Sequence, residues 1–167
     1  MRIKVDLEMI LPEVLKKLDK PGLILGSGEE CNPMTIGWAS YGIMWNKPVF
    51  TIMVRPVRHS FTLLEQIKEF TINVPSDNMN KEIGICGSKS GRDFDKLELC
   101  DFTAENSYAI SVPYIKECPI HLECRTVFTN DVIAGSLNKE MIDLYYPHAD
   151  LHRFYYGEIM GAWREEE

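Results

Sequence analysis

The stretch TIGWASYGIMWNKPVFTIMVRPVRHS, residues 35–60, carries the strand pattern from which the fold is predicted. Residues 35–41 are rich in β-forming side chains, and VFTIMV at 49–54 is a continuous apolar run typical of a buried strand. Between them, Asn46-Lys47-Pro48 predicts a turn, because asparagine and proline favour turn conformations. The stretch therefore predicts two neighbouring antiparallel strands, the second of which ends at Arg55-Pro56.

Further strands and short helices are predicted on both sides of this pair. Strands are expected for FTINV at 70–74, IHLECRTVF at 120–128 and RFYYGEIMGAW at 153–163, and a short apolar run, LILG, precedes them at 23–26. Helices are expected over 60–68 with Ser60 as the N-terminal cap, over 80–87 ending at Gly87, and as one turn within 94–99. The segment 129–151 fits a hairpin, a short helix or an ordered loop.

Many short strands with only a few short helices predict a mainly β fold. The arrangement expected is a closed or partly closed antiparallel barrel decorated by helices. A length of 167 residues, of which 45% are hydrophobic, is enough for one core, so residues 1–167 are expected to form a single domain.

The charge of the chain excludes several classes of partner. The formal net charge is −7 and the isoelectric point is near 5.2, which disfavours nucleic acids and anionic membrane surfaces. No apolar run reaches the roughly 18 residues of a membrane span. The N-terminal MRIKVDLEMILPEV carries acids within its apolar stretch and lacks a small-residue cleavage site, so no signal peptide is predicted and the expected location is cytoplasmic.

The cysteines predict free thiols and no metal site. Their number is odd and no CxxC pair occurs among Cys31, Cys86, Cys100, Cys118 and Cys124. Cys118, His121 and Cys124 have a ligand-like spacing. In an alternating strand, however, Cys118, Ile120, Leu122 and Cys124 face one side and His121 the other, so the three ligands would not converge.

Three segments carry groups that suit a small anionic ligand. CNPMTIGWAS at 31–40 supplies the amide of Asn32 and the hydroxyls of Thr35 and Ser40, although it also fits a turn followed by a buried strand. RPVRHS at 55–60 places two arginines and His59 before a helix N-terminus, and its alternative is a solvated basic turn.

The third segment, CGSKSGRDFDK at 86–96, offers glycines, serines and cations that together suit a phosphate monoester. Its alternative is a flexible surface loop. The spacing is not that of a GxxxxGK[ST] phosphate loop, and no strand precedes a GxGxxG unit. A nucleoside triphosphatase and a dinucleotide-binding Rossmann domain are therefore not supported.

Taken in order, these segments resemble the flavin reductase-like FMN-binding split-barrel family, which includes flavoredoxins and NAD(P)H:flavin oxidoreductases. The resemblance runs from about Lys20 to Val74 and again through 86–96, and NPMTIGW, KPVFTIMVRPVRHS, FTINVP and CGSKSGRDFDK carry it. It implies a six-stranded antiparallel Greek-key split barrel with a few short helices. It also implies a homodimer that binds FMN near the subunit interface.

The resemblance implies which residues bind the flavin. In NPMTIGW, the Thr35 and Ile36 groups would lie beside the isoalloxazine ring, with Met34 in the same segment and Asn32 and Trp38 near the ring or its chain. Beyond the ring, the ribityl-phosphate contacts would be Arg58, His59, Ser60, Ser90 and Lys96, together with the backbone around Cys86 and Gly87. Ser40 completes the first segment.

Members of this family often carry a histidine just before a strand of the GEV type, and in HRFYYGEIMGAW that residue would be His152. A surface histidine, spaced by chance from His148, is the favoured interpretation. The rest of the site needs no catalytic side chain, because FMN carries the redox chemistry itself.

The expected activity is hydride transfer from NADH or NADPH to FMN. The alternative is a non-enzymatic, flavoredoxin-like electron carrier with tightly bound FMN and a redox protein as its partner. A third hypothesis keeps the barrel as a protein-interaction module without flavin, and the intact cationic loop speaks against it.

Overall fold

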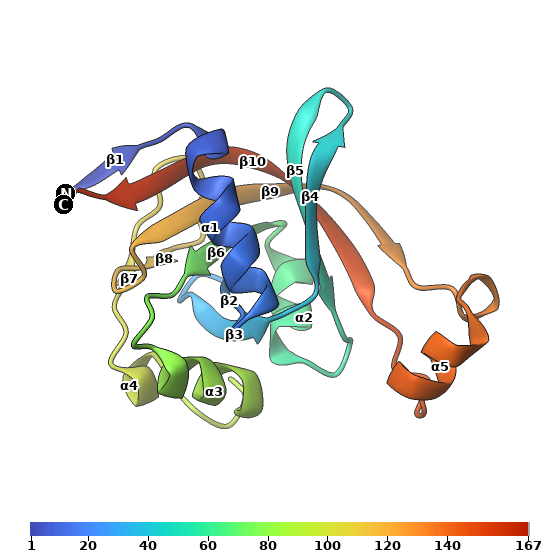
Figure 1. Cartoon of the computed structure of the whole chain (residues 1–167). Helices are drawn as coiled ribbons and strands as arrows, with labels where there is room; N and C mark the ends of the chain where they lie inside the picture. Colours follow the sequence, from blue (N-terminus) through green and yellow to red (C-terminus); the bar gives the residue numbers. More distant parts are fainter. Residues whose placement is uncertain (167) are drawn as a thin grey trace.

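The computed structural model describes residues 1–166 and shows a curved antiparallel sheet of eight strands (Figure 1). The sheet contains β1 (Arg2–Lys4), β2 (Leu23–Ser27), β3 (Asn32–Ile36), β4 (Ala39–Met44), β5 (Lys47–Val54), β6 (Glu69–Val74), β9 (Ile120–Asp131) and β10 (Arg153–Glu165). A separate pair consists of β7 (Ala104–Glu105) and β8 (Tyr114–Ile115). The helices are α1 (Leu7–Asp19), α2 (His59–Gln66), α3 (Asn80–Ser88), α4 (Lys96–Cys100) and α5 (Lys139–Tyr145), with a 3-10 turn, η1, at Ala134–Ser136.

The order of strands in the sheet is β3-β2-β6-β9-β10-β5-β4, and β1 pairs with β10. The predicted mainly β, antiparallel architecture with few helices is confirmed, although the sheet has more strands than the six that were expected. No helix within residues 1–166 is long and apolar enough to cross a membrane.

The predicted strand at 35–41 is in fact two strands that lie at opposite ends of the sheet. β3 pairs with β2, whereas β4 pairs with β5, and the chain turns between them at Gly37 and Trp38. A run of β-forming residues does not reveal such a corner, because the same side chains suit both strands. The corner lets one continuous segment form both free ends of the barrel sheet.

The hairpin of β4 and β5 turns earlier than the sequence predicted. Met44 pairs with Lys47, so the turn is the two residues Trp45 and Asn46, whose φ angles are 52° and 57°. Two consecutive left-handed residues are what a tight hairpin of this twist requires. Pro48 lies within the strand, one residue before pairing with β10 begins at Val49.

The longest strands, β9 and β10, pair along their length and continue past the barrel. Two register shifts, at Tyr156/Gly157 and Ile159/Gly161, bend the ribbon. The ambiguous segment 129–151 extends β9 and then forms η1 and α5, so its helical alternative is correct. Residues 132–152 form a lobe that Figure 1 shows beyond the barrel at the end of this ribbon, and we call it the α5 lobe.

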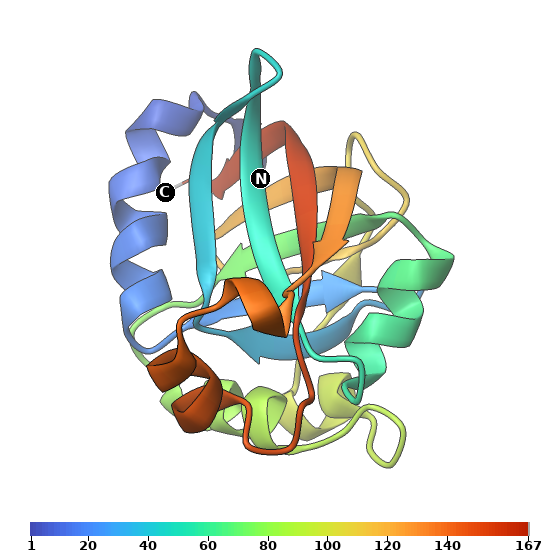
Figure 2. The same ribbon diagram turned by 90° about the vertical axis from the view of Figure 1, so that its right-hand side faces the viewer.

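Helix α1 was not predicted. Its side chains Ile10, Val14 and Leu18 recur at four-residue spacing and join the barrel core, and Figure 2 shows the helix running alongside β4. Pro12 lies within the helix. A proline normally interrupts a helical pattern, which hides this one in the sequence.

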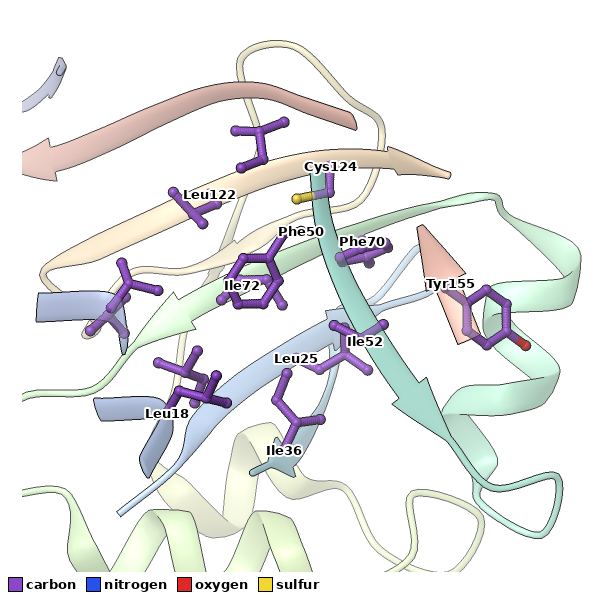
Figure 3. Close-up of a cluster of buried hydrophobic side chains, with 14 of the residues drawn as sticks. Leu18, Leu25, Ile36, Phe50, Ile52, Phe70, Ile72, Leu122, Cys124 and Tyr155 are labelled. Atoms are coloured by element: carbon purple, nitrogen blue, oxygen red, sulfur yellow. The ribbon is translucent and has the colours of Figure 1, made fainter. Parts of the chain in front are cut away.

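The core fills the space between the curved strands and α1 (Figure 3). Phe50 and Ile52 of β5 face Phe70 and Ile72 of β6 there, and all four side chains are fully buried. Each such side chain contributes about 1.5–3 kcal/mol by leaving water. This packing holds the ends of the strands in place, and the polar segments that were predicted to bind a ligand lie at those ends.

Candidate functional site

Two adjoining cavities lie where β3, the start of α2, the end of α3 and the loop 89–95 meet. The small cavity has a volume of about 90 Å³ and the wide cavity about 280 Å³, and Met34 and Arg58 line both. Of the predicted site residues, only Ser40 and Cys86 line neither cavity. The residues that line one or both cavities are Asn32, Met34, Thr35, Ile36, Trp38, Arg58, His59, Ser60, Gly87, Ser90, Lys96 and His152.

Two cations are anchored at the end of α3, where they border the small cavity. Lys96 Nζ donates to the carbonyl of Cys86 at 3.4 Å, and Arg58 Nη2 donates to the carbonyl of Gly87 at 3.0 Å. Neither side chain has a carboxylate partner within residues 1–166. Lys96 is only 3% exposed. Burial, together with the charge of Arg58, lowers the pKa of the ammonium to about 8.

Ser60 is part of the small cavity, but it does not cap α2 as predicted. The N-cap residue is Arg58, and Ser60 lies buried in the first turn of the helix. Its Oγ accepts a hydrogen bond of 3.0 Å from Asn32 Nδ2. This contact joins β3 to α2 across the cavity. It involves Ser60 as a residue of the first turn, because the helix begins at His59 and not after a serine cap.

The loop 89–95 reaches these residues only because Gly91 has no side chain. A Cβ atom there would lie 2.0 Å from Asn32 Oδ1 and 2.9 Å from His59 Cδ2. His59 Nδ1 is buried and has no hydrogen-bond partner among the described residues. Burial lowers the pKa of His59, and the charges of Arg92 and Lys96 lower it further. The closed loop therefore leaves a neutral imidazole with one free nitrogen beside the cations.

In the wide cavity, the side chain of Thr35 fixes α3 against β3. Its Oγ1 donates to the carbonyl of Ile83 at 2.6 Å, and Gly87 packs against the same threonine. Trp38, on the corner between β3 and β4, keeps 43% of its surface exposed. The cavity therefore combines a polar wall of backbone and hydroxyl groups with an open aromatic edge.

The interpretation of His152 as a surface histidine is wrong. The side chain is 8% exposed, and its Nδ1 lies 2.6 Å from the hydroxyl of Tyr146. The ring also packs on Trp38, with 5.2 Å between ring centroids. Burial, together with the charge of Arg55, lowers the pKa of His152 to about 4, so the imidazole is neutral at pH 7.

Arg55 was noted in the sequence but was not assigned to the site. Its Nη1 donates to the carbonyl of Asp150 at 2.9 Å, and its Nη2 donates to the carbonyl of Tyr145 at 2.8 Å. Arg55 thereby holds the α5 lobe against the rim of the wide cavity. Tyr145, Tyr146 and Asp150 were missed because no local pattern connects them to a residue some 90 positions earlier.

Two predicted residues lie outside the cavities. Ser40 is exposed on β4, and its neighbours Ala39 and Tyr41 face the core instead. The Cys86 side chain points into a second buried cluster, where its Sγ lies 3.8 Å from Cys100 Sγ. Only the carbonyl of Cys86 takes part in the site. Burial raises the pKa of its thiol to about 12, so Cys86 stays protonated.

The alternation predicted for residues 118–124 holds only from Ile120 onward. Leu122 and Cys124 face the main core, whereas Cys118 lies in the turn before β9 and joins the second cluster. His121 lies on the opposite face, where its Nε2 is 3.1 Å from Glu123 Oε1.

The family model described as flavin reductase like domain matches residues 15–167. An uncharacterized protein of Archaeoglobus fulgidus is 30% identical over 63% of this chain and 59% of its own length. A second uncharacterized protein, from Pyrococcus abyssi, is 30% identical over 65% of this chain and 62% of its own length. The chain thus matches about three fifths of each of these relatives.

Solved structures share the fold over most of the chain. The flavoredoxin of Methanosarcina acetivorans is 28% identical and superposes with a TM-score of 0.70, covering 87% of this chain and 69% of the flavoredoxin. An FMN-binding domain of a flavin reductase-like enzyme from Shewanella baltica is 20% identical with a TM-score of 0.67, covering 98% and 77% of the two chains. The predicted split-barrel fold is confirmed by these neighbours.

Proposed function

The chain belongs to the flavin reductase-like domain family, and on that premise we propose that it binds FMN across the small and wide cavities and exchanges electrons through it. The phosphate would lie in the small cavity and the isoalloxazine ring in the wide one. The chemistry that FMN supplies when bound is the acceptance and release of a hydride or of single electrons.

One observation carries the proposal, and it concerns the ammonium group of Lys96. Lys96 is only 3% exposed and lies beside Arg58, and its ammonium group has no carboxylate partner within residues 1–166. Buried charges are costly unless they are paired, so this arrangement calls for an anion. The small cavity adds the hydroxyls of Ser60 and Ser90. Two cations and two hydroxyls around a space of about 90 Å³ suit a phosphate monoester.

The residues of the wide cavity suit a flat, amphipathic ring. Ile36 and Met53 supply apolar surface, and the backbone of 35–37 supplies polar groups along one edge. Trp38 and His152 would limit the access of water at the rim. The role of this chain is then to bind and orient the flavin, with no acid or base side chain required for hydride transfer.

The favoured activity is an NAD(P)H-dependent flavin reductase, in which a nicotinamide reaches the ring through the open edge at Trp38. The 28% identity with a flavoredoxin supports a second candidate, an electron-transfer protein that holds FMN permanently. The two differ in their electron donor, which is a nicotinamide in the first and a redox protein in the second.

A homodimer completes the proposal. Apolar side chains on the β4–β5 hairpin, the outer part of β9 and the start of the α5 lobe are exposed, among them Ile43, Trp45, Phe128 and Ile133. Trp45 and Phe128 contact each other in this patch. Such a surface suits burial against a second copy of the chain. Light scattering coupled to size exclusion is the direct measurement, and a monomer at micromolar concentration would contradict this part.

The test of function is a visible spectrum followed by anaerobic reduction. Purified protein incubated with FMN should retain it through gel filtration or turn it over, and NADH or NADPH should then bleach the oxidised-flavin absorbance. Bleaching by reduced ferredoxin but not by either nicotinamide selects the electron carrier. Failure to bind FMN at all rejects both candidates.

A further inference from the structure

Two cysteines of the second buried cluster lie close enough to react with each other. Cys86 belongs to the last turn of α3 and Cys100 is the last residue of α4, and these two helices pack against each other (Figure 1). Their Sγ atoms are 3.8 Å apart, and both residues are free thiols in this structure. A disulfide needs its sulfur atoms about 2.0 Å apart, so these two would have to approach by about 1.8 Å.

The same two cysteines flank the cation that is proposed to hold the flavin phosphate. Lys96 and Cys100 are four residues apart on α4 and therefore share one face of that helix. Lys96 Nζ donates to the carbonyl of Cys86 at 3.4 Å, while the sulfur of Cys86 lies against Cys100. A bond between the two sulfur atoms would thus tie the helix that carries Lys96 to the turn that anchors its ammonium group.

The segment that such a bond would close contains the whole loop over the small cavity. Residues 86–100 include the loop 89–95, whose Gly91 fits closely against Asn32 and His59. A cross-link between the two ends of a short segment removes open conformations of that segment, because its ends can no longer separate. A phosphate held beneath the loop would then be released more slowly.

We propose that Cys86 and Cys100 form a reversible disulfide that fastens the loop 89–95 over the flavin phosphate. The reduced protein exchanges its FMN readily, and the oxidised protein retains it. This inference rests on the proposed function and adds to it a redox control of how long the flavin stays bound.

Hydrogen peroxide is the oxidant, and the reaction balances without any further reactant. Cys100 reacts first, because 7% of its surface is exposed whereas Cys86 is fully buried. The sulfur of Cys100 attacks one peroxide oxygen, the O–O bond breaks, and the other oxygen leaves as water with the thiol proton. The sulfur of Cys86 then attacks the sulfenic sulfur, the S–O bond breaks, and a second water leaves with the proton of Cys86. Burial raises the pKa of both thiols, so oxidation is expected to take minutes to hours.

Peptide mapping after peroxide treatment tests for the bond without any assay of flavin. Trypsin cuts at lysines between the two cysteines, so Cys86 lies in peptide 82–89 and Cys100 in peptide 97–116, each without a second cysteine. Once free thiols are alkylated, the two peptides are expected as one linked species that dithiothreitol separates. The number of free thiols should fall from five to three, because two are consumed. A bond from either peptide to another cysteine, or oxidation of Cys100 without a bond, overturns the assignment.

The rate of FMN release tests the consequence of the bond. Release from the oxidised protein is expected to be about tenfold slower than from the reduced protein, whereas riboflavin, without a phosphate, should change less than about twofold. Dithiothreitol should restore the faster rate. Cys100→Ser should bind FMN as the reduced parent does and show no response to peroxide. Cys118→Ser, in the same buried cluster, is the matched control and should respond as the parent does.

The outcomes separate this inference from the proposed function. Failure of peroxide to form the bond, or a bond that leaves FMN release unchanged, overturns the redox control and leaves flavin binding intact. Absence of FMN binding in both redox states rejects the proposed function, and the control of flavin retention fails with it. Mapping and release from the parent protein need no variant, so the inference stays testable even where a serine variant does not fold.

Discussion

The small cavity and the rim of the wide cavity are built in contrasting ways. In the small cavity, the cations Lys96 and Arg58 are bonded to backbone carbonyls of one helix, and Gly91 closes the loop over them. At the rim, Trp38 meets His152 and the α5 lobe through side-chain packing and long-range contacts of Arg55. The small cavity is therefore preformed, whereas the aromatic edge of the wide cavity depends on a distant segment.

Removal of the buried ammonium group of Lys96 should cause the largest loss of FMN affinity. Lys96→Ala is expected to weaken FMN by about 1.5–3 kcal/mol, roughly 10- to 150-fold, because a charge-assisted contact with the phosphate is lost. Riboflavin has no phosphate, so its affinity should change less than about twofold. Fluorescence titration measures both flavins, and Lys81→Ala, at an exposed lysine of α3 outside the cavities, is the control. Equal losses for the two flavins would refute the phosphate assignment.

Filling the space at Gly91 should give the next largest effect. In Gly91→Ala the new Cβ meets Asn32 and His59, so the loop must move outward and the affinity for FMN should fall about tenfold. Gly135→Ala is the matched control, because a Cβ there meets nothing within 4 Å. Both variants are compared by flavin titration and by thermal unfolding. An unchanged affinity in Gly91→Ala would show that the loop closes without help from this glycine.

The rim should respond to acid through His152. His152 has a pKa of about 4, below its ordinary value near 6.5, so the unfolded protein binds a proton more readily between these values. The stability contributed by the neutral imidazole is complete above pH 6.5 and is lost as the pH falls towards 4. Urea unfolding across this window should therefore show a shallower pH dependence in His152→Phe than in the parent. Parallel curves for the two proteins would reject the assignment to His152.

The smallest effects are expected at Ser60 and Ser40, which were both predicted from the sequence to lie in the flavin site. Ser60→Ala removes the acceptor of the Asn32 amide and should weaken FMN severalfold, by about 1 kcal/mol. Ser40→Ala, on the exposed side of β4, should change FMN affinity by less than about 0.5 kcal/mol. Isothermal titration resolves the difference, and a larger loss at Ser40 would place that residue in the binding site of a dimer.

The two halves of the candidate site also differed in how well the sequence predicted them. The residues of the small cavity could be predicted, because glycines, hydroxyls and cations are clustered within short stretches of sequence at 31–40, 55–60 and 86–96. The position of His152 could not be judged in this way. Its burial depends on Tyr146 and Trp38, and Trp38 is more than a hundred positions away.

The fold shows the same division. Strand composition predicted the antiparallel barrel and the positions of β5, β6, β9 and β10. It failed at the corner after Ile36, where the chain changes partner strands without a change in composition. It also missed α1, whose buried residues are regularly spaced but which carries the exposed Pro12 between Ile10 and Val14.

The carbonyl anchors at the end of α3 have an entropic consequence. Long cationic side chains usually lose rotamer freedom when they close on a ligand, which costs about 0.5–1.5 kcal/mol for each side chain. Lys96 and Arg58 are already immobilised by Cys86 and Gly87, so that loss occurs when the protein folds. The flavin phosphate would meet donors that need no reorganisation, and added salt would screen the buried ammonium less than a surface one.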